Sequence, residues 1–511
     1  MDVAAPPPLT SSRGARRLWL YALAMVAPAV GFARRYPLAP NADGLTDIGK
    51  LAGYRVAEFV GYAGGLGLMF VLYVLALRET RRLPARTAMP AVVAGGVALA
   101  LAFAAMYPVN AIDLFLYAVR SRLFTAHGAD PLAAYPEDYP EDPWSRFASR
   151  EWADNVSPYG PLWNLVAAPI TALAGDRLLL ALVGFKALAV AAILLGGWLV
   201  ARTLAATRPD GAATGALFYL WNPLVLWEGV GNGHNDAVLA VPLLLALLAW
   251  ARRRDRWVVP WLLVGVLLKY VTGLLVPLAA LALWRRAGGW PARWRLVFGS
   301  VGIALVATVI AFFPFYAPLA VRDSLAAQGT IFLTSPAAVV VAEWRIRDPD
   351  ADPDDLKRWS RIVGQALLLA GLAVLARRVW VDPARLPRSA FEALFLFLLV
   401  ATWNFRGWYL IWLVAVAATL PWGWPAWRTI AWTAGALAGY GHFIWIREWW
   451  KTDFATLQTV GVLLMTGPAA LLAAAEAATT WRVRPAATER PPAASDLRTA
   501  EAEIGTTPND H

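Results

Sequence analysis

The sequence contains no cysteine. This absence excludes disulfide bonds, thiolate nucleophiles and cysteine-ligated metal centres. Charged residues are also scarce, at 16% of 511 residues, whereas 59% of the residues are apolar and the mean hydropathy is +0.50. A soluble chain of this length would need more charge to cover its surface, so we expect lipid to form part of the solvent.

The charge that is present is unevenly distributed. The net charge is +11, and the arginines stand in short runs between apolar segments. Such runs are typical of cytoplasmic anchors under the positive-inside rule, and we expect no nucleic-acid partner. Many of the 27 tryptophans lie near the ends of apolar runs, where an amphipathic ring suits the headgroup zone. The apolar stretch after Arg17 continues to Arg34 without a small-residue cleavage site, which indicates a first span and not a signal peptide.

Apolar runs suited to membrane helices recur along the chain. A bilayer core needs about 20 apolar residues per helix, because lipid offers no partner to an unpaired backbone group. Two segments do not fit as single spans: 159–174 is short and opens with Pro161, and 257–284 is too long and carries Lys269 midway. We expect full spans at 18–33, 55–77, 89–107, 178–200, 212–229, 236–251, 296–316, 360–376, 389–403, 407–421, 427–446 and 455–476.

Charge then predicts the topology. Placing the arginine-rich loops and both termini in the cytoplasm requires an even number of crossings between each pair of loops. This holds if 159–174 dips in and returns and 257–284 folds as a hairpin of two short helices. The arginine-rich loops are 78–86, 252–256, 285–295 and 377–388. The polar loops that then share the outer side are 108–158, 229–235, 317–359, 404–406 and 447–454.

The predicted fold class follows. We expect an all-α, polytopic transmembrane helical bundle of about 12–14 membrane elements, some broken or re-entrant, under an outer cap of an amphipathic helix and loops. Residues 1–481 would form one transmembrane domain, with the cap at 108–158 and a further outer loop at 317–359. The tail 482–511 is rich in Ala, Pro, Glu and Thr, so we expect it to be cytoplasmic and disordered.

The first outer loop carries a candidate base. Asp113, Tyr117 and Arg120 follow the third span at a spacing that puts them on one face of a helix. In one interpretation these residues only cap and solvate an amphipathic helix at the interface. In the other, Asp113 deprotonates an acceptor hydroxyl, a task that a low-dielectric boundary favours.

The rest of this loop predicts a rigid cap. Prolines are frequent between residues 131 and 161 and disfavour helices. Tyr159 and Trp163 are among several aromatic residues that could stack on sugar rings or anchor the chain at the interface. Glu151 and Asp154 are further acids in the same outer loop.

A second polar cluster separates two apolar runs. Glu228, Asn232, His234, Asn235 and Asp236 lie within nine residues of one another. So compact a polar loop at membrane depth is costly unless its members are paired or functional. The acids and the histidine could also bind a divalent metal, but their spacing does not require it, and we expect no metal or other cofactor.

Two cations remain. Lys269 has no acidic neighbour within eight residues, and an unpaired ammonium in an apolar run costs on the order of 3 kcal/mol. Arg406, in the segment that begins at Trp403, raises the same question. We expect both cations to converge on an anion, and a phosphate at headgroup level is the obvious candidate.

Together these segments resemble the GT-C superfamily of membrane glycosyltransferases. The resemblance is carried by Asp113 after an early span and by the motifs SPYGPLW (157–163), GNGHNDAV (231–238) and GVLLKY (265–270). It spans roughly residues 90–410 and is closest to the bacterial polyprenol-phosphate-mannose-dependent α-mannosyltransferases. In one respect the chain departs from superfamily members with paired acids in this loop, since Asn110 stands three residues before Asp113.

The resemblance implies a function. It implies inverting transfer of a hexose, mannose above all, from a polyprenyl-phosphate donor to a glycan or glycolipid acceptor. The reaction would take place on the outer face of a bacterial cytoplasmic membrane, with Asp113 as the base. The donor phosphate would bind Lys269 and Arg406, and the sugar would contact Glu228, Tyr159, His234, Asn235 and Asp236. Our candidates on the acceptor side are Tyr117, Arg120, Glu151, Asp154, Trp163 and Trp403.

The main alternative is a membrane transporter or flippase for a lipid-linked or small anionic substrate, since broken helices and intramembrane cations also mark transport sites. A lipid-modifying or assembly factor without catalysis is another. The sequence shows no inverted repeat, and its polar residues collect on one predicted side and not at the midplane.

Overall fold

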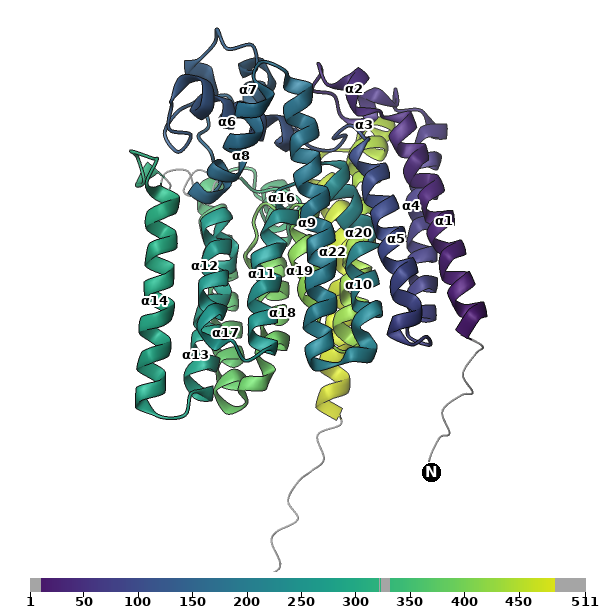
Figure 1. The fold of residues 1–511 in the computed structure, drawn as a ribbon. Coiled ribbons are helices and arrows are strands. Elements are labelled where there is room, and N and C mark those ends of the chain that lie inside the picture. Colours follow the sequence, from purple (N-terminus) through teal and green to yellow (C-terminus); the bar gives the residue numbers. More distant parts are fainter. Residues whose placement is uncertain (1–10, 321, 323–330, 483–511) are drawn as a thin grey trace, which may run out of the picture.

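The computed structural model describes residues 11–320, 322 and 331–482. They form a bundle of upright helices, covered at one end by a cap of short helices and loops (Figure 1). No β-strand occurs in this part of the chain, where two isolated bridges join extended segments. The all-α polytopic bundle is therefore confirmed.

Every apolar segment predicted to span the bilayer is helical. Most are continuous helices: α1 (Ser11–Arg35), α4 (Val56–Thr80), α5 (Ala85–Ala104), α9 (Leu178–Thr207), α11 (Asp236–Ala251), α14 (Trp290–Phe312), α17 (Pro353–Val381) and α22 (Phe454–Arg482). The others combine an α-helix with a short π-helical segment or, in one case, a 3₁₀ turn. The π-helical segments follow α10 (Ala212–Leu220) at Val225–Gly231, α18 (Leu386–Leu396) at Phe397–Ala401 and α20 (Trp424–Gly441) at His442–Ile446, and the 3₁₀ turn Gly407–Tyr409 precedes α19 (Leu410–Ala417).

Length and apolar composition alone qualify fewer of these as membrane helices. Six helices in the described part of the chain pass on these criteria: α4, α5, α9, α14, α17 and α22 up to Thr479. The turn Val225–Gly231 and α11 pass as a pair bent by 117° and would make a seventh. The shorter or interrupted helices α10, α18, α19 and α20 complete the bundle beside these longer helices.

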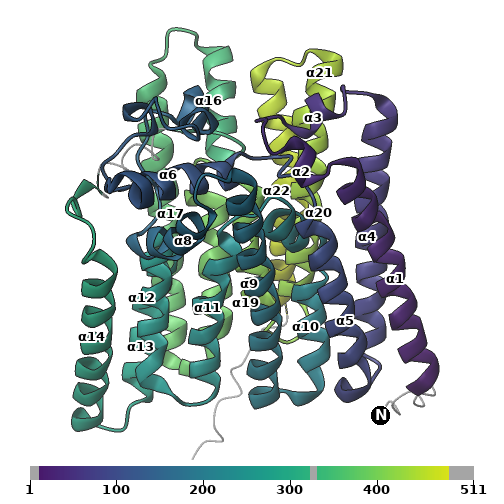
Figure 2. The same ribbon diagram turned by 45° about the horizontal axis from the view of Figure 1, so that its top comes forward.

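The arginine-rich loops share one end of the bundle. Arg286 forms an ion pair with Asp255 (3.3 Å), which joins the second loop to the third. Arg285 donates to the Trp380 carbonyl (3.0 Å), which joins the third to the fourth. Figure 1 shows the turn between α4 and α5, the start of α1 and the end of α22 at this same end. The polar loops lie at the other end, where Figure 2 shows α6 (Asp113–His127), α16 (Pro336–Arg347) and α21 (Arg447–Trp450).

The predicted hairpin is present. α12 (Val258–Leu268) runs toward the cap, the turn Tyr270–Leu275 reverses the chain, and α13 (Val276–Arg286) returns. Thr272 in the turn donates to the Leu262 carbonyl (2.9 Å), which fastens the tip to the first arm. Lys269, whose backbone is extended, therefore stands at the tip.

Segment 159–174 forms α8 (Pro161–Ala174) and does not cross the bundle. At its start, the Gly160 amide donates to the Leu268 carbonyl at the hairpin tip (3.0 Å). At its end, the Gly175 carbonyl accepts from Arg122 in the cap (2.8 Å). α8 thus connects the hairpin tip with the cap, as expected of a segment that dips in and returns.

Some expectations need qualification. The predicted disordered tail falls almost wholly on 483–511, and part of the predicted loop 317–359 falls on 321 and 323–330, all outside the described residues. The association of tryptophan with the interface is wrong for several members. Trp221, Trp227, Trp432 and Trp445 are fully buried and belong to the helix-packing core.

Candidate active site

α6 presents Asp113 in its first turn, where the positive end of the helix dipole favours a carboxylate. Asp113 Oδ1 accepts a hydrogen bond of 2.9 Å from the Tyr159 hydroxyl. The Tyr159 ring contacts that of Tyr117, one turn after Asp113 (5.3 Å between centroids). The predicted common face of Asp113 and Tyr117 therefore exists and is turned toward the start of α8.

The prediction of an amphipathic helix lying along the interface is wrong for α6. All residues from Leu114 to Leu123 are buried, including both arginines. Arg120 donates to the Asn155 carbonyl (3.2 Å), and Arg122 forms ion pairs with Asp142 of the cap and with Asp176. Because these charges have partners inside the cap, the helix can be covered on all sides.

The second polar cluster is buried against α6. Asn232 donates to Glu228 (3.0 Å) and accepts from the Asn110 amide (3.1 Å). The Asn235 amide donates to the Tyr117 hydroxyl (3.2 Å). These bonds join two loops that are more than 100 residues apart in the sequence.

His234 stands between two acids. Its Nε2 lies 3.3 Å from Glu228 Oε2, and its Nδ1 lies 4.0 Å from Asp113 Oδ1. The ring stacks on Trp408 with 3.8 Å between centroids. Within the described residues, no group of three or more His, Asp or Glu side chains is placed to hold a metal ion.

Lys269 is paired, contrary to the prediction. Its Nζ donates to both carboxylate oxygens of Asp236, at 2.8 and 3.0 Å. Asp236 lies 33 positions earlier, so a search of the neighbouring sequence could not find it. Nζ also lies 4.8, 5.4 and 5.9 Å from the ring centroids of Tyr409, Trp412 and Tyr159. An acid and three aromatic faces thus hold this cation.

Arg406 is the second cation of the site. It is half-buried, and its guanidinium lies 5.8 Å from the Trp408 ring centroid. No ion pair of Arg406 is present within the described ranges. Lys269, Asp236, Arg406 and Asp113 all lie close enough to Tyr409 to act electrostatically on its hydroxyl. Both predicted cations therefore lie in the neighbourhood of Tyr409, and Lys269 is in direct contact with its ring.

Exposure separates the members of the cluster. The side chains of Glu228, His234 and Asp236 are 0% exposed, whereas those of Asp113 and Lys269 are 22% and 18% exposed. A carboxylate and an ammonium thus reach the surface of the cluster, and the fully buried residues support them from behind.

The acceptor-side candidates also fall into buried and exposed residues. Tyr117, Arg120 and Trp163 are buried, so they form the wall behind Asp113 and do not line an open surface. Glu151 and Asp154 are exposed on the cap. The remaining candidate, Trp403, stacks on Phe332, and its carbonyl accepts hydrogen bonds from Leu333 and Ser335.

Sequence reasoning missed Lys186. This residue of α9 is 2% exposed and donates to the carbonyls of Met106 (2.8 Å), Val230 (2.8 Å) and Gly231. It therefore ties the end of α5 to the turn that leads into the His234 loop. The signal was available, because a lysine inside the apolar run 178–200 is as unusual as Lys269.

A charged cluster fastens the cap. Arg122 donates to Asp142 (2.7 Å) and Asp176 (2.7 Å), and His127 Nε2 lies 2.8 Å from the same Asp142 oxygen. Burial by itself would raise the pKa of Asp142. The hydrogen bonds with His127 and Arg122 outweigh burial and hold this pKa below its ordinary value.

Comparison with known proteins agrees with the resemblance. Alpha-(1->6)-mannopyranosyltransferase B of Corynebacterium glutamicum is 26% identical over 221 residues, which are 40% of this chain and 36% of that protein. Alpha-(1->6)-mannopyranosyltransferase A of Mycobacterium tuberculosis is 25% identical over 374 residues, 68% of this chain and 70% of that protein. The match to the first relative thus spans about a third of that protein's length.

A family model covers the larger part of the site. The model described as "Alpha-(1->6)-mannopyranosyltransferase, N-terminal domain" matches residues 18–285, just over half of the chain. This range contains Asp113, the His234 loop and Lys269, while Arg406 lies beyond it. The chain is a member of the alpha-(1->6)-mannopyranosyltransferase family.

Proposed function

We propose that the chain is a glycosyltransferase that moves mannose from a polyprenyl-phosphate donor to a hydroxyl of a glycan or glycolipid acceptor. Family membership and the names of both relatives support the sugar. The apolar bundle supports a lipid-linked donor, and the cluster at the cap end supports the reaction site. We place this end on the extracytoplasmic face of a bacterial cytoplasmic membrane, with both termini cytoplasmic.

Asp113 is the proposed base, and its exposure is the observation that carries the proposal. Of the acids in the cluster, Glu228 and Asp236 are 0% exposed, whereas Asp113 is 22% exposed and can meet an incoming hydroxyl. The hydrogen bond from Tyr159 orients the carboxylate. The 4.0 Å approach of His234 lends further polar support.

The proposed reaction is a single inverting displacement. The acceptor oxygen gives its proton to Asp113 and forms a bond to the anomeric carbon. The bond from that carbon to the phosphate oxygen breaks, and its electron pair leaves with the phosphate. Base and cations supply what the reaction needs, so we propose that no cofactor takes part.

Lys269 and Arg406 would stabilise the departing phosphate. Lys269 is already neutralised by Asp236, so its charge is shared and not free. Arg406 would bring the uncompensated positive charge that an anionic donor requires. Their common neighbour Tyr409 supports a shared role of the two cations in donor binding.

Unpartnered polar atoms would receive the sugar hydroxyls. Among the described residues, the side-chain amide of Asn110 and Oδ1 of Asn235 are buried without a hydrogen-bond partner. Buried polar groups of this kind are costly unless a ligand satisfies them. We therefore propose that the hexose binds beside the His234 loop, with Glu151 and Asp154 on the acceptor's path.

The test compares two acidic residues of the same region. Purified protein is supplied with polyprenyl-phosphate mannose and a mannoside acceptor, and Asp113→Asn is compared with Glu141→Gln, a substitution on the exposed cap. We expect Asp113→Asn to lower kcat by about 10²–10⁴-fold while thermal stability and donor binding persist. Near wild-type turnover in Asp113→Asn would remove the assignment. Donor flux across proteoliposomes without product would favour the transporter or flippase.

A further inference from the structure

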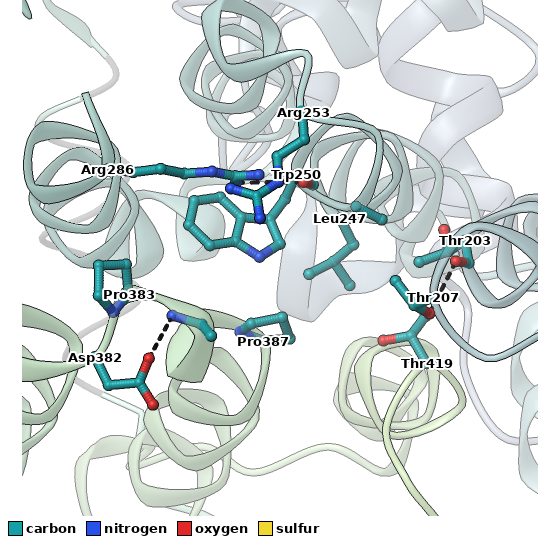
Figure 3. A pocket seen from close by; sticks show the side chains of 12 residues that line it. Thr203, Thr207, Leu247, Trp250, Arg253, Arg286, Asp382, Pro383, Pro387 and Thr419 are labelled. Atoms are coloured by element: carbon teal, nitrogen blue, oxygen red, sulfur yellow. Dashed lines mark hydrogen bonds between the residues drawn. The ribbon is translucent and has the colours of Figure 1, made fainter. Parts of the chain in front are cut away.

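A pocket opens at the end of the bundle opposite the cap. Its volume is about 470 Å³, and it lies where the ends of α9, α11 and α13 meet the turn between α17 and α18 (Figure 3). Lys269 and Asp113 do not line it. The reaction proposed above does not use this pocket.

Two arginines converge on the pocket. Arg286 enters from α13 with its guanidinium 4.2 Å from the Trp250 ring centroid, and Arg253 enters from the end of α11 (Figure 3). The two cations lie close enough to repel each other. Like charges held together at a concave surface indicate an anionic ligand.

The charges nearby do not cancel this potential. Arg286 is paired with Asp255 (3.3 Å), and Asp382 is engaged by Arg385 (3.2 Å) and by the Ala384 amide (3.0 Å). Arg253 is found in none of the ion pairs of the described part of the chain. One uncompensated positive charge therefore faces the pocket.

Backbone geometry also singles out Arg253. Its φ of +58° lies in the left-handed region, where a helix end ordinarily carries glycine. A side chain in this conformation costs roughly 1 kcal/mol. The side chain so placed is directed over the pocket in Figure 3.

The walls fit a lipid headgroup better than a soluble anion. Leu247, Trp250 and Pro387 give an apolar side, and Thr203, Thr207 and Thr419 give hydroxyls. An adjoining pocket of about 620 Å³, formed by residues 253–257, adds Arg254 and Arg256. The site thus joins apolar walls to cations at the arginine-rich end of the helices, where headgroups of the bilayer would lie.

We propose that this pocket binds the phosphodiester headgroup of an anionic phospholipid, with Arg253 as its main contact and Arg286 beside it. The occupant would join α9, α11 and α13, and so hold the base of the hairpin whose tip carries Lys269. The proposal is independent of the catalytic role of Asp113.

The test measures lipid binding to the purified full chain in detergent. Phosphatidylglycerol is titrated by native mass spectrometry and by the shift in Tm, in parallel with phosphatidylcholine and inorganic phosphate. Arg253→Gln should weaken phosphatidylglycerol binding about tenfold, the loss expected for one charge-assisted hydrogen bond. Arg82→Gln removes the same charge from an exposed loop at the same end and should change binding by less than about twofold.

A second variant tests the cavity itself. Thr207→Trp fills the pocket without changing any charge, and it should weaken phosphatidylglycerol binding as Arg253→Gln does. Equal effects of Arg82→Gln and Arg253→Gln would overturn the proposal, as would equally tight binding of phosphatidylcholine. Displacement of the lipid by millimolar inorganic phosphate would also overturn it, in favour of a soluble anion.

Discussion

Lys269 and Asp236 form a bidentate pair, with Nζ 2.8 and 3.0 Å from the two carboxylate oxygens. The tip of the α12–α13 hairpin is thereby attached to the first turn of α11. Asp236 is fully buried and Lys269 retains 18% of its side-chain exposure. Asp236 and the surrounding rings thus hold the ammonium in the fold, and a small part of the side chain stays accessible.

Replacing only one member of this pair should lower the free energy of unfolding. Lys269→Met leaves a buried carboxylate without its partner, and we expect a loss of about 3–5 kcal/mol in unfolding free energy. The double variant Lys269→Met with Asp236→Asn should recover most of this loss, because neither charge of the pair remains. Denaturation measures stability, and donor binding should stay weak in both variants. A double variant no more stable than Lys269→Met would contradict the pairing.

Tyr159→Phe removes the hydroxyl that donates to Asp113 and keeps the ring against Tyr117. We expect kcat to fall on the order of tenfold, the value of one hydrogen bond to a charged group. KM for the donor should change little, because the ring still packs beside Lys269. Steady-state kinetics check this split. A change confined to KM would place Tyr159 in donor binding instead.

The cap should loosen in acid. The folded-state pKa of Asp142 lies below its ordinary value of 3.8. Its ionised carboxylate therefore stabilises the fold above about pH 4, and this contribution disappears as the pH falls through the folded-state pKa. Hydrogen exchange in the cap should accelerate over that range. Asp142→Asn should loosen the cap already at neutral pH and flatten the acid response, whereas Asp154→Asn should leave the response unchanged.

Gly160 marks the close approach of α8 to the hairpin tip. A Cβ at this position would collide with the backbone carbonyl of Leu267, which cannot move as a side chain can. We expect Gly160→Ala to cost roughly 1–3 kcal/mol and to lower activity by displacing Tyr159. Gly61→Ala is the control, because no atom lies within 4 Å of the added carbon. Equal Tm values for the two variants would contradict the contact.

Lys186→Met should weaken the support of the His234 loop. Three buried carbonyls would lose their donor, and we expect a loss of at least about 2 kcal/mol with reduced turnover. Lys50→Met, at an exposed position, should have little effect on either quantity. Unchanged turnover in Lys186→Met would mean that the loop holds its geometry without this cation.

Much of the architecture could be predicted from the sequence, because it depends on local composition. Apolar length predicted the helices, and arginine runs predicted which loops share one end. The charge flanking 257–284 predicted a hairpin with Lys269 near its tip. These inferences needed only the cost of placing charge and unpaired backbone in lipid.

The partners within the site came from the tertiary structure alone. Asp236 reaches Lys269 across 33 positions, and Trp408 stacks on His234 across 174. Periodicity carries no information about such distant contacts. The burial of α6 was missed for the same reason, since Arg120 and Arg122 can be enclosed only when the cap supplies their partners.

The sequence by itself thus determined that this is a helical membrane protein with polar residues at one end, because solvation acts on each segment separately. Only the tertiary structure decided which of those residues are buried and which reach the surface. That division depends on contacts between segments far apart in the chain, and it is what distinguishes Asp113 from the acids behind it.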